Sequence, residues 1–558
     1  MAAILPRLKA SSRALRAVVA NPNLRRVQLA RAGSVVSGWA YAVALSVFAF
    51  DAGGTTAVGI VGLIVMLPAA MAAPFAALLA DRHRRERVLL LATLLRAVAL
   101  AGVATAMLAQ NADVVVYVLA ALASVLARVF SPAAAALLPS LAQTPDELAA
   151  ANVTSSAIDS VGLFVGPALG GLLLASTSPG FVVGLTAGTL LITAAVVTRI
   201  RTERRPAPAR TRTETIARDF GAGFRTIAGE PRLRLLIGLY GAQTLAAGAL
   251  NVLIVVSAFK LLGLGKAGVG YVNSAFGAGA LIGAPAALIL VGRKHVASRF
   301  ALGMLLWAFP IALVALWPIA AVALALFAAV GIGNTIIDVA IFTLLQRGVA
   351  DDVLARVFGV LEGLTVGTIG IGSVVAPLLV AAFSDRGALL ALGVSLALLT
   401  ALVWPRIAAL DAASPAPDRA LALLRSVPFF SALPAATLAE LAQHAQRIPF
   451  PAATTIVTEG NDTPDRFYVI DEGTVHVTAA GAHVAALGPG DYFGEIALLR
   501  NVPRVASVEA RTDVVAYALE RPDFLSAVTG HPASAEAAGA AVATRLRSLR
   551  PGLAPLGS

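Results

Sequence analysis

Residues 150–175 read AANVTSSAIDSVGLFVGPALGGLLLA, an apolar segment with a single charge, Asp159. At 1.5 Å per residue, a helix of this length crosses about 30 Å of hydrocarbon. Its second half carries glycines and a proline at Gly162, Gly166, Pro167, Gly170 and Gly171. Small residues at this spacing let helix backbones approach closely, and a proline permits a kink. The segment therefore predicts a transmembrane helix that packs tightly against other helices.

Apolar segments of similar length recur along the chain. The 558 residues are 58% hydrophobic and 13% charged, whereas a soluble protein carries about 25% charged residues, so most of the surface is expected to face lipid. Further spans are expected at residues 27–50, 55–80, 87–109, 113–136, 180–198, 233–257, 267–291, 299–317, 319–345, 355–382 and 387–404. The fold class is therefore predicted to be a polytopic α-helical membrane protein with about twelve transmembrane helices.

Charges between these spans are distributed unevenly. Basic clusters lie before the first span and in the connections 82–87, 199–218 and 293–299. The alternate connections hold little beyond Asp51, Asp113, Lys260, Lys266, Asp385 and Arg386. The positive-inside rule then predicts a multi-pass protein of the plasma membrane with both termini in the cytoplasm. The abundance of alanine and of arginine over lysine is typical of GC-rich bacterial genomes, which suggests a bacterial inner membrane.

The net charge of +12 indicates membrane lipid rather than nucleic acid as the partner, because the basic residues lie between apolar segments. The chain has no cysteine, which excludes disulfides, thiolate metal sites and a cysteine nucleophile. No GxxxxGK[ST] phosphate loop is present, which argues against ATP-driven transport. We therefore expect neither an enzyme nor a metal or organic cofactor.

A polar segment divides the spans into two sets. The expected parts are an N-terminal half at 1–205, a cytoplasmic linker at 206–232 and a C-terminal half at 233–405. Leu137-Leu138 lead into PDEL at 145–148, and Leu344-Leu345 lead into DDVL at 351–354, an offset of about 206 residues. This internal similarity predicts two homologous six-helix repeats.

The composition changes after residue 405. A second linker is expected at 406–425, followed by a C-terminal domain at 426–548. Short apolar runs such as FYVI at 467–470 are followed by turn residues, and a final helix is expected near 533–548. Short strands with regular turn signals predict a small β-roll with flanking helices.

The connection at 77–87, ALLADRHRRER, resembles the GxLaDrxGrR loop of the major facilitator superfamily. The resemblance implies a charged network at the transport gate, formed here by Asp81, Arg82 and Arg85. Ala77 and Arg84 replace the two glycines of that motif, which weakens the expectation of close helix approach. The alternative is a simple anchor to anionic headgroups.

The ten residues GLFVGPALGG, at 162–171, match GxxxGPxxGG and look like the antiporter signature of that family's exporters. The resemblance to the superfamily covers about residues 27–405 and implies an efflux transporter of a small molecule. The alternative for the glycines is ordinary close helix packing. Neither motif identifies the substrate.

Four charged residues inside predicted spans are singled out: Arg128, Asp159, Asp338 and Glu362. A charge in hydrocarbon is costly, so each is a candidate for transport or proton coupling. Arg128 and Asp159 are expected at similar depth, and an alternative is that they form a structural ion pair. Asp338 and Glu362 have the same sign, so proximity would favour protonation of one of them. They are the preferred candidates for proton coupling, unless they face a solvated cavity or a basic partner.

Residues 426–530 resemble cyclic-nucleotide-binding domains of the catabolite-activator and protein-kinase-A regulatory type. GDYFGEIALL at 490–499 and PRVASV at 503–508 match that family's phosphate-binding cassette. The resemblance implies ligand contacts from Gly494, Glu495, Ile496, Ala497, Arg504, Val505 and Ala506.

These residue types suit a cyclic phosphate. A short helix beginning near Glu495 points backbone N–H groups at the anion, and Arg504 adds a charge-assisted contact. The resemblance implies that Glu495 accepts from the ribose 2′-hydroxyl. It also implies guanine preference where threonine follows the arginine, and Val505 has no hydroxyl, so the expected regulatory ligand is cAMP rather than cGMP. The alternative is a purely structural β-roll.

The function expected from these parts is secondary active transport, with a proton-coupled exporter regulated by cytoplasmic cyclic nucleotide. An alternative is a transporter-like membrane receptor that senses rather than transports. A cyclic-nucleotide-gated channel fits least well, because the spans lack a recognisable selectivity filter and an arginine-rich voltage-sensor helix.

Overall fold

The computed structural model describes residues 20–549 apart from 83, 110–112, 201–220, 222, 292–294, 350, 414–416 and 462–464. The chain divides into two compact units, Met1–Ala412 and Ala413–Ser558. The first unit is helical, and the second contains all the described strands. Each unit is considered separately below.

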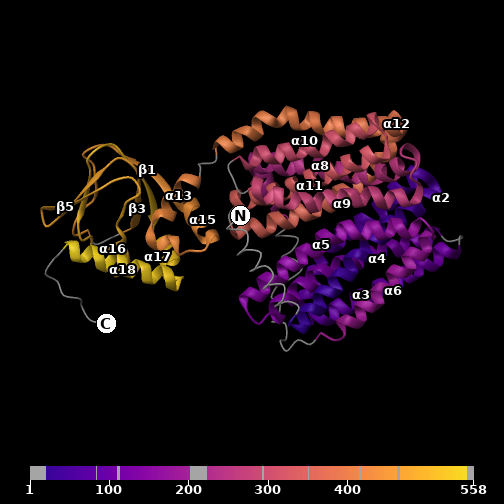
Figure 1. Ribbon diagram of the computed structural model, residues 1–558, viewed down its shortest axis with the longest axis horizontal. Helices are drawn as coiled ribbons and strands as arrows, with labels where there is room; N and C mark the ends of the chain where they lie inside the picture. The colour runs from indigo at the N-terminus through magenta and orange to yellow at the C-terminus, as the bar shows by residue number, and fades with distance from the viewer. Residues whose placement is uncertain are drawn as a thin grey trace. The chain divides into compact units, whose positions relative to one another are not determined.

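The first unit is a set of long apolar helices (Figure 1). They are α2 (Pro22–Arg82), α3 (Arg85–Ala109), α4 (Asp113–Leu141), α5 (Pro145–Leu174), α6 (Pro179–Val197), α8 (Pro231–Val256), η1 (Ser257–Leu261), α9 (Gly265–Val291), α10 (Val296–Leu316), α11 (Ala320–Gly348) and α12 (Asp351–Ala413). Nine helices among the described residues are long and apolar enough to cross a membrane. This confirms a multi-span helical protein, while the number twelve and the two-repeat layout stay predictions.

Two of these helices bend sharply between expected spans. Helix α2 contains non-helical backbone at Gly53 (φ −159°) and Gly54 (φ 61°), between the expected spans 27–50 and 55–80. Helix α12 contains Ser384 at φ 67°, between the expected spans 355–382 and 387–404. A positive φ turns the chain out of the right-handed helix. Each long helix therefore consists of two straight segments joined by a bend.

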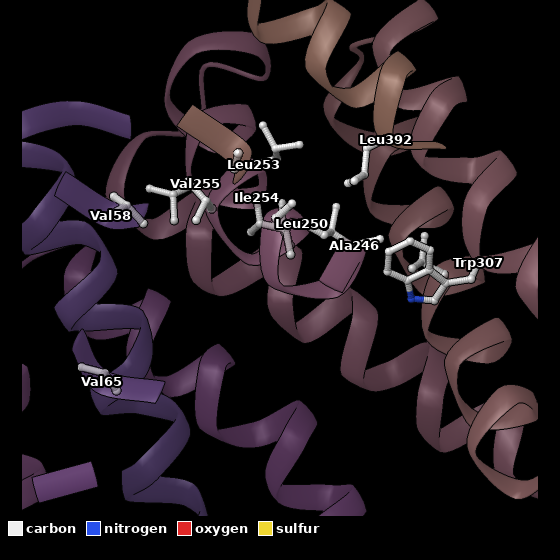
Figure 2. Close-up of a cluster of buried hydrophobic side chains, with 14 of the residues drawn as sticks. Val58, Val65, Ala246, Leu250, Leu253, Ile254, Val255, Trp307 and Leu392 are labelled. Atoms are coloured by element: carbon white, nitrogen blue, oxygen red, sulfur yellow. The ribbon is translucent and has the colours of Figure 1, made fainter. Parts of the chain in front are cut away.

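The core of this unit joins residues from almost all of its helices. Helix α2 packs against α4, α5 and α6, while α9 packs against α5 and α11. Figure 2 shows part of the core, where Leu250 and Ile254 of α8 lie between Val58 of α2 and Trp307 of α10. Large apolar side chains also cover the outside, including Val114 at 74% and Leu402 at 80% exposure. A soluble protein avoids such extended apolar surface, whereas lipid solvates it.

The second unit is a β-roll flanked by helices (Figure 1). Its helices are α13 (Pro417–Ser426), α14 (Pro428–Ser431), α15 (Ala435–His444), α16 (Glu495–Arg500), α17 (Arg521–Thr529) and α18 (Pro532–Leu549). Its strands are β1 (Gln446–Phe450), β2 (Thr455–Val457), β3 (Arg466–Glu472), β4 (Val475–Ala479), β5 (Ala482–Leu487), β6 (Tyr492–Phe493), β7 (Ser507–Ala510) and β8 (Val514–Glu520). They form two antiparallel four-stranded sheets in the orders β1-β8-β3-β6 and β2-β7-β4-β5.

Aromatic packing holds the flanking helices against the roll. Phe429 and Phe430 of α14 and Phe524 of α17 surround Phe467 of β3, and all four are fully buried. The Phe467 and Phe524 rings stack with centroids 4.8 Å apart. Ser534 of α18 donates a hydrogen bond to the carbonyl of Phe429 at 2.7 Å. These contacts hold α18 against α14, which in turn packs on β3.

Candidate functional site

A cavity of about 180 Å³ lies in the β-roll. One wall is apolar and comes from strands β2, β4, β5 and β7 and from the β4–β5 hairpin: Val457, Val477, Val484, Ala485, Leu487 and Val508. The other wall holds the polar groups and the start of α16: Phe493, Gly494, Glu495, Ile496, Ala497, Arg504, Val505, Ala506 and Arg545. An apolar wall facing a few charged groups is the usual form of a small-molecule site. All the residues expected in the cassette line this cavity, and their contacts to a nucleotide stay predictions.

Gly494 and Arg504 fit together at the charged wall. Gly494 precedes α16 at φ 97°, and a Cβ added there would lie 2.8 Å from Nη1 of Arg504. Arg504 donates from Nη1 to the Gly494 carbonyl at 3.1 Å and from Nη2 to the Arg466 carbonyl at 2.8 Å. Its side chain is 5% exposed. The guanidinium is therefore held in place by backbone acceptors, close to where an anion would enter the cavity.

Glu495 is held by an arginine from the last helix. Its side chain is 1% exposed, and Arg545 of α18 donates to its Oε1 at 2.8 Å. The same guanidinium donates to the Tyr492 carbonyl at 2.7 Å and lies 4.0 Å from the centroid of the Tyr492 ring. Sequence reasoning placed a helix here but missed Arg545. The residue lies 50 positions from Glu495, and no local motif relates the two.

Burial and charge oppose each other at this wall. Burial raises the pKa of Glu495 above its usual range, although Arg545 and Arg504 act in the opposite direction. Burial also lowers the pKa of Arg504, which the charges of Tyr468, Asp465 and Glu495 partly offset. Both shifts have the same cause, because a charged group loses hydration when the protein covers it. A ligand that offers an anion to Arg504 and a hydroxyl to Glu495 would satisfy both groups.

A second cavity, of about 560 Å³, lies inside the helical unit. Its lining comes mainly from α2, α3 and α4, with Glu362 contributed by α12. Arg128, a sequence candidate, lines it together with Arg31 and Arg96, which the sequence reasoning did not single out. Glu362 is the second sequence candidate that lines this cavity, and it belongs to the C-terminal half of the sequence, whereas the other lining residues belong to the N-terminal half.

The expected alternative of an Arg128–Asp159 ion pair is wrong. Asp159 instead pairs with Arg31 of α2 through two hydrogen bonds, at 2.9 Å from Nε and 2.5 Å from Nη2. Arg31 lies near the start of the first expected span, 27–50, and sequence reasoning did not single it out. Within the described part of the chain, Arg128 has no hydrogen-bond or ion-pair partner.

Asp338 lies in a network of neutral groups rather than in this cavity. The Tyr240 hydroxyl donates to its Oδ1 at 3.1 Å, and Asn334 donates from Nδ2 to its Oδ2 at 2.8 Å. Gln243 extends the network by donating to Asn334 at 3.3 Å. Among the described residues, no basic side chain pairs with Asp338. The role of Asp338 and Glu362 in proton coupling stays a prediction.

The glycine motif of α5 packs against two helices at once. A Cβ added at Gly166 would lie 2.5 Å from the Trp39 side chain of α2, and one at Gly171 would lie 2.7 Å from the Ala267 carbonyl of α9. Only glycine allows such close approach. Since α2 and α9 belong to different halves of the sequence, α5 connects the two expected halves.

The gate motif is only partly described. The side chains of Asp81 and Arg82 lie outside the described residues. Arg85 donates from Nη1 to the Ala136 carbonyl of α4 at 2.5 Å. Arg84, which replaces a motif glycine, pairs with Glu86 at 2.8 Å. The gate function of the motif stays a prediction.

The charges expected in the alternate connections meet in pairs. Lys266 of α9 pairs with Asp51 of α2 at 2.6 Å, and Lys260 pairs with Asp385 at 3.3 Å. The first of these links the two halves of the sequence next to the bend in α2. Exposed ion pairs contribute little stability, about 0–1 kcal/mol each. Little free energy is therefore needed to break either of these two ion pairs.

Long apolar helices around an internal cavity are typical of a polytopic membrane protein. Residues 29–370 match the Major Facilitator Superfamily. The match covers more than half of the chain, and the protein belongs to that superfamily. Residues 447–531 match the cyclic nucleotide-binding domain. Neither is an enzyme family.

Two curated relatives match a short part of the chain. The cAMP-dependent protein kinase regulatory subunit of Aspergillus niger is 40% identical over 105 residues, which is 18% of this chain and 25% of the relative. The corresponding subunit of Candida albicans is 42% identical over 73 residues, 13% of this chain and 16% of the relative. The chain thus spans about a quarter or less of the length of these relatives.

Solved structures are likewise similar to part of the chain. The regulatory domain of Toxoplasma gondii protein kinase A, co-crystallised with cAMP, is 27% identical with a TM-score of 0.22, covering 24% of this chain and 51% of that chain. The regulatory subunit of a cAMP-independent protein kinase A from Trypanosoma brucei is 28% identical with a TM-score of 0.21, covering 24% and 45%. The two family matches, at residues 29–370 and 447–531, together support a transporter regulated by cyclic nucleotide.

Proposed function

We propose that the protein is a proton-coupled exporter of a small molecule in the plasma membrane, regulated by cAMP that binds the C-terminal domain in the cytoplasm. The observation that carries the regulatory part is the cavity wall formed by Arg504 and Glu495. It offers one fixed cation and one carboxylate beside an apolar wall. A cyclic nucleotide presents a monoanionic phosphate, a ribose hydroxyl and an apolar base face.

The preference for cAMP is supported by the group beside the phosphate contact. Val505 and Ala506 follow Arg504 in the cavity lining, and neither carries a hydroxyl or amide that could recognise a guanine edge. Guanine carries a 2-amine, an N1–H and a 6-oxo group, whereas adenine carries only its 6-amine on that edge, so an apolar lining leaves more polar groups of guanine unpaired. cGMP is therefore expected to bind more weakly than cAMP.

Transport is supported by the second cavity and by contacts that join the two halves of the sequence. Glu362 of the C-terminal half lines a cavity otherwise formed by the N-terminal half. The Asp51–Lys266 pair and the Gly171 contact with α9 join the same halves. Alternating access requires contacts of this kind to break on one side while others form. Because each exposed ion pair contributes little stability, exchanging such contacts requires little free energy.

Proton coupling is supported by the surroundings of Asp338. Neutral donors hold both carboxylate oxygens, and no described basic residue compensates its charge. Carboxylates inside membrane spans are rare and often belong to proton relays of transporters. Export rather than import rests on the glycine motif of α5, which resembles the antiporter signature.

The proposal is tested with the purified full-length protein in two steps. Calorimetric titration with cAMP and cGMP measures nucleotide binding directly. Compounds retained in cells that lack the gene, but exported by cells that contain it, are then assayed for flux in proteoliposomes under a pH gradient, with and without cAMP. Gradient-driven flux that changes with cAMP supports the proposal. Tight cAMP binding without flux of any such compound would favour a receptor instead.

A further inference from the structure

The cavity of the helical unit is lined by more positive than negative charge. Three arginines reach it from three different helices, Arg31 of α2, Arg96 of α3 and Arg128 of α4. Glu362 is the one acidic residue in its described lining. The charge of Arg31 is matched by Asp159, to which it is bonded. If Glu362 matches one of the remaining arginines, one positive charge is left without a partner.

Arg96 is buried in a way that leaves a donor unused. Its side chain is 7% exposed, and Nη1 donates to the hydroxyl of Ser34 at 3.1 Å. Its Nε–H is buried and has no hydrogen-bond partner among the described residues. The hydroxyl of Tyr41, which also lines the cavity, is buried and unpartnered in the same part of the chain. Buried donors without acceptors are unfavourable and rare, so two at one cavity indicate a missing acceptor.

The backbone leaves space for this guanidinium. A Cβ added at Gly38 of α2 would lie 3.2 Å from Nη2 of Arg96, closer than most side-chain contacts. Arg128 lies near enough to Arg96 for the two like charges to interact. Two neighbouring arginines repel one another unless an anion lies between them. Their arrangement is therefore explained by a ligand that carries negative charge.

We propose that this cavity binds the transported substrate and that the substrate is a small organic anion with an apolar or aromatic part. The anion would lie against Arg96 and Arg128, within reach of the Tyr41 hydroxyl. The apolar part would contact Trp39, Met66 and Phe130, which line the same space. The volume of about 560 Å³ falls within the usual range of small-molecule sites. This inference rests on the proposed transport function and narrows it to a substrate class.

An arginine relay for protons explains the same residues less well. A guanidinium keeps its proton at any ordinary pH, so it does not exchange protons during a transport cycle. It remains a permanent cation with several donors in a plane, which suits carboxylate, sulfonate or phosphate groups. Glu362 is the one carboxylate in the described lining, and it contributes a single negative charge beside the arginines.

The chain contains no cysteine, so an introduced cysteine is the only thiol in the full-length protein. Ser124 lines the cavity, and Ser124→Cys reports its local charge. The probes are 2-sulfonatoethyl methanethiosulfonate, an anion, and 2-trimethylammonioethyl methanethiosulfonate, a cation. Each rate is divided by the rate of the same reagent with a small free thiol. The matched control is Ser176→Cys, which lies in the exposed connection between α5 and α6.

We expect the anionic probe to be favoured at Ser124→Cys by at least about tenfold relative to Ser176→Cys. Adding Arg96→Gln or Arg128→Gln should remove most of this preference, and Arg96→Lys should restore part of it. Unchanged rates at the control cysteine show that the reagents behave alike, and unchanged melting curves show that these variants remain folded. Equal rates for both probes, a preference for the cation, or no reaction at Ser124→Cys would overturn the proposal.

The same proteins separate this inference from the proposed function. If the export assay finds only cationic or neutral substrates, the anion assignment fails while the transport function stands. If no compound is exported but the anionic probe is strongly favoured, the cavity is an anion site in a protein that does not transport. Export of organic anions that is weakened by Arg96→Gln supports both.

Discussion

Arg504 is the residue on which the assignment of the nucleotide site depends most. Its guanidinium is 5% exposed and is held by the carbonyls of Gly494 and Arg466 at 3.1 and 2.8 Å. Because it is ordered before the ligand binds, little side-chain entropy is lost when the phosphate arrives. A hydrogen bond to a charged group contributes about 1.5–3 kcal/mol. Arg504→Gln should therefore weaken cAMP binding by roughly 10- to 150-fold.

The assay is calorimetric titration of the full-length protein with cAMP. Arg500→Gln is the matched control, because Arg500 ends α16 four positions before Arg504, is exposed and does not line the cavity. Arg504→Lys should recover part of the affinity, since it keeps the charge but loses the fork geometry. A melting curve without nucleotide shows whether loss of the two backbone contacts also destabilises the fold. Unchanged cAMP affinity in a folded Arg504→Gln protein, or an equal loss in Arg500→Gln, would refute the assignment.

The remaining predictions concern three other residues. Burial raises the pKa of Glu495, and only the ionised form accepts a hydrogen bond from the ribose hydroxyl, so cAMP affinity should fall as the pH is lowered through that raised pKa. This pH dependence should be absent in Glu495→Gln. A cAMP affinity of the wild-type protein that does not change with pH would contradict the prediction. Gly494→Ala should lower the free energy of unfolding of the domain by at least about 1 kcal/mol in denaturant titrations, because φ is 97° and Arg504 occupies the space of a Cβ. The control Gly488→Ala should leave that free energy unchanged, because a Cβ there would lie in open space. Asp338→Asn should abolish flux driven by a pH gradient but retain substrate exchange in proteoliposomes, and full gradient-driven flux would place proton coupling elsewhere.

The nucleotide site was predictable because its residues are close in sequence. Gly494, Glu495 and Arg504 lie within one short segment, and the turn before α16 brings them to one cavity wall. The positive φ of Gly494 and the backbone acceptors of Arg504 are consequences of that same local turn. Arg545 could not be inferred in this way. It reaches Glu495 only because α18 packs back over the roll, which depends on contacts such as that between Ser534 and Phe429.

In the helical unit, the spans were easier to predict than the partners of their charges. Long apolar segments identify helices, and Gly53 and Gly54 fall where a connection was expected. The rotation of each helix is not fixed by hydropathy when nearly all its residues are apolar. Asp159 was consequently considered with Arg128, whereas the rotation of α2 brings Arg31 to it across 128 positions. Arg96 was missed for the same reason, since its burial is visible only after the helices are packed.

The contact between Arg545 and Glu495 also suggests how nucleotide could affect transport. The carboxylate that a ribose hydroxyl would use is already occupied by the last helix. Nucleotide must therefore share Glu495 with Arg545 or displace it, so ligand affinity and the position of α18 are coupled. A ligand shifts a conformational equilibrium only by its difference in affinity between the two states. If the position of α18 differs between two states of the transporter domain, that coupling extends to the transport cycle. Linkage is reciprocal, so the state of the transporter must then change cAMP affinity by the same factor.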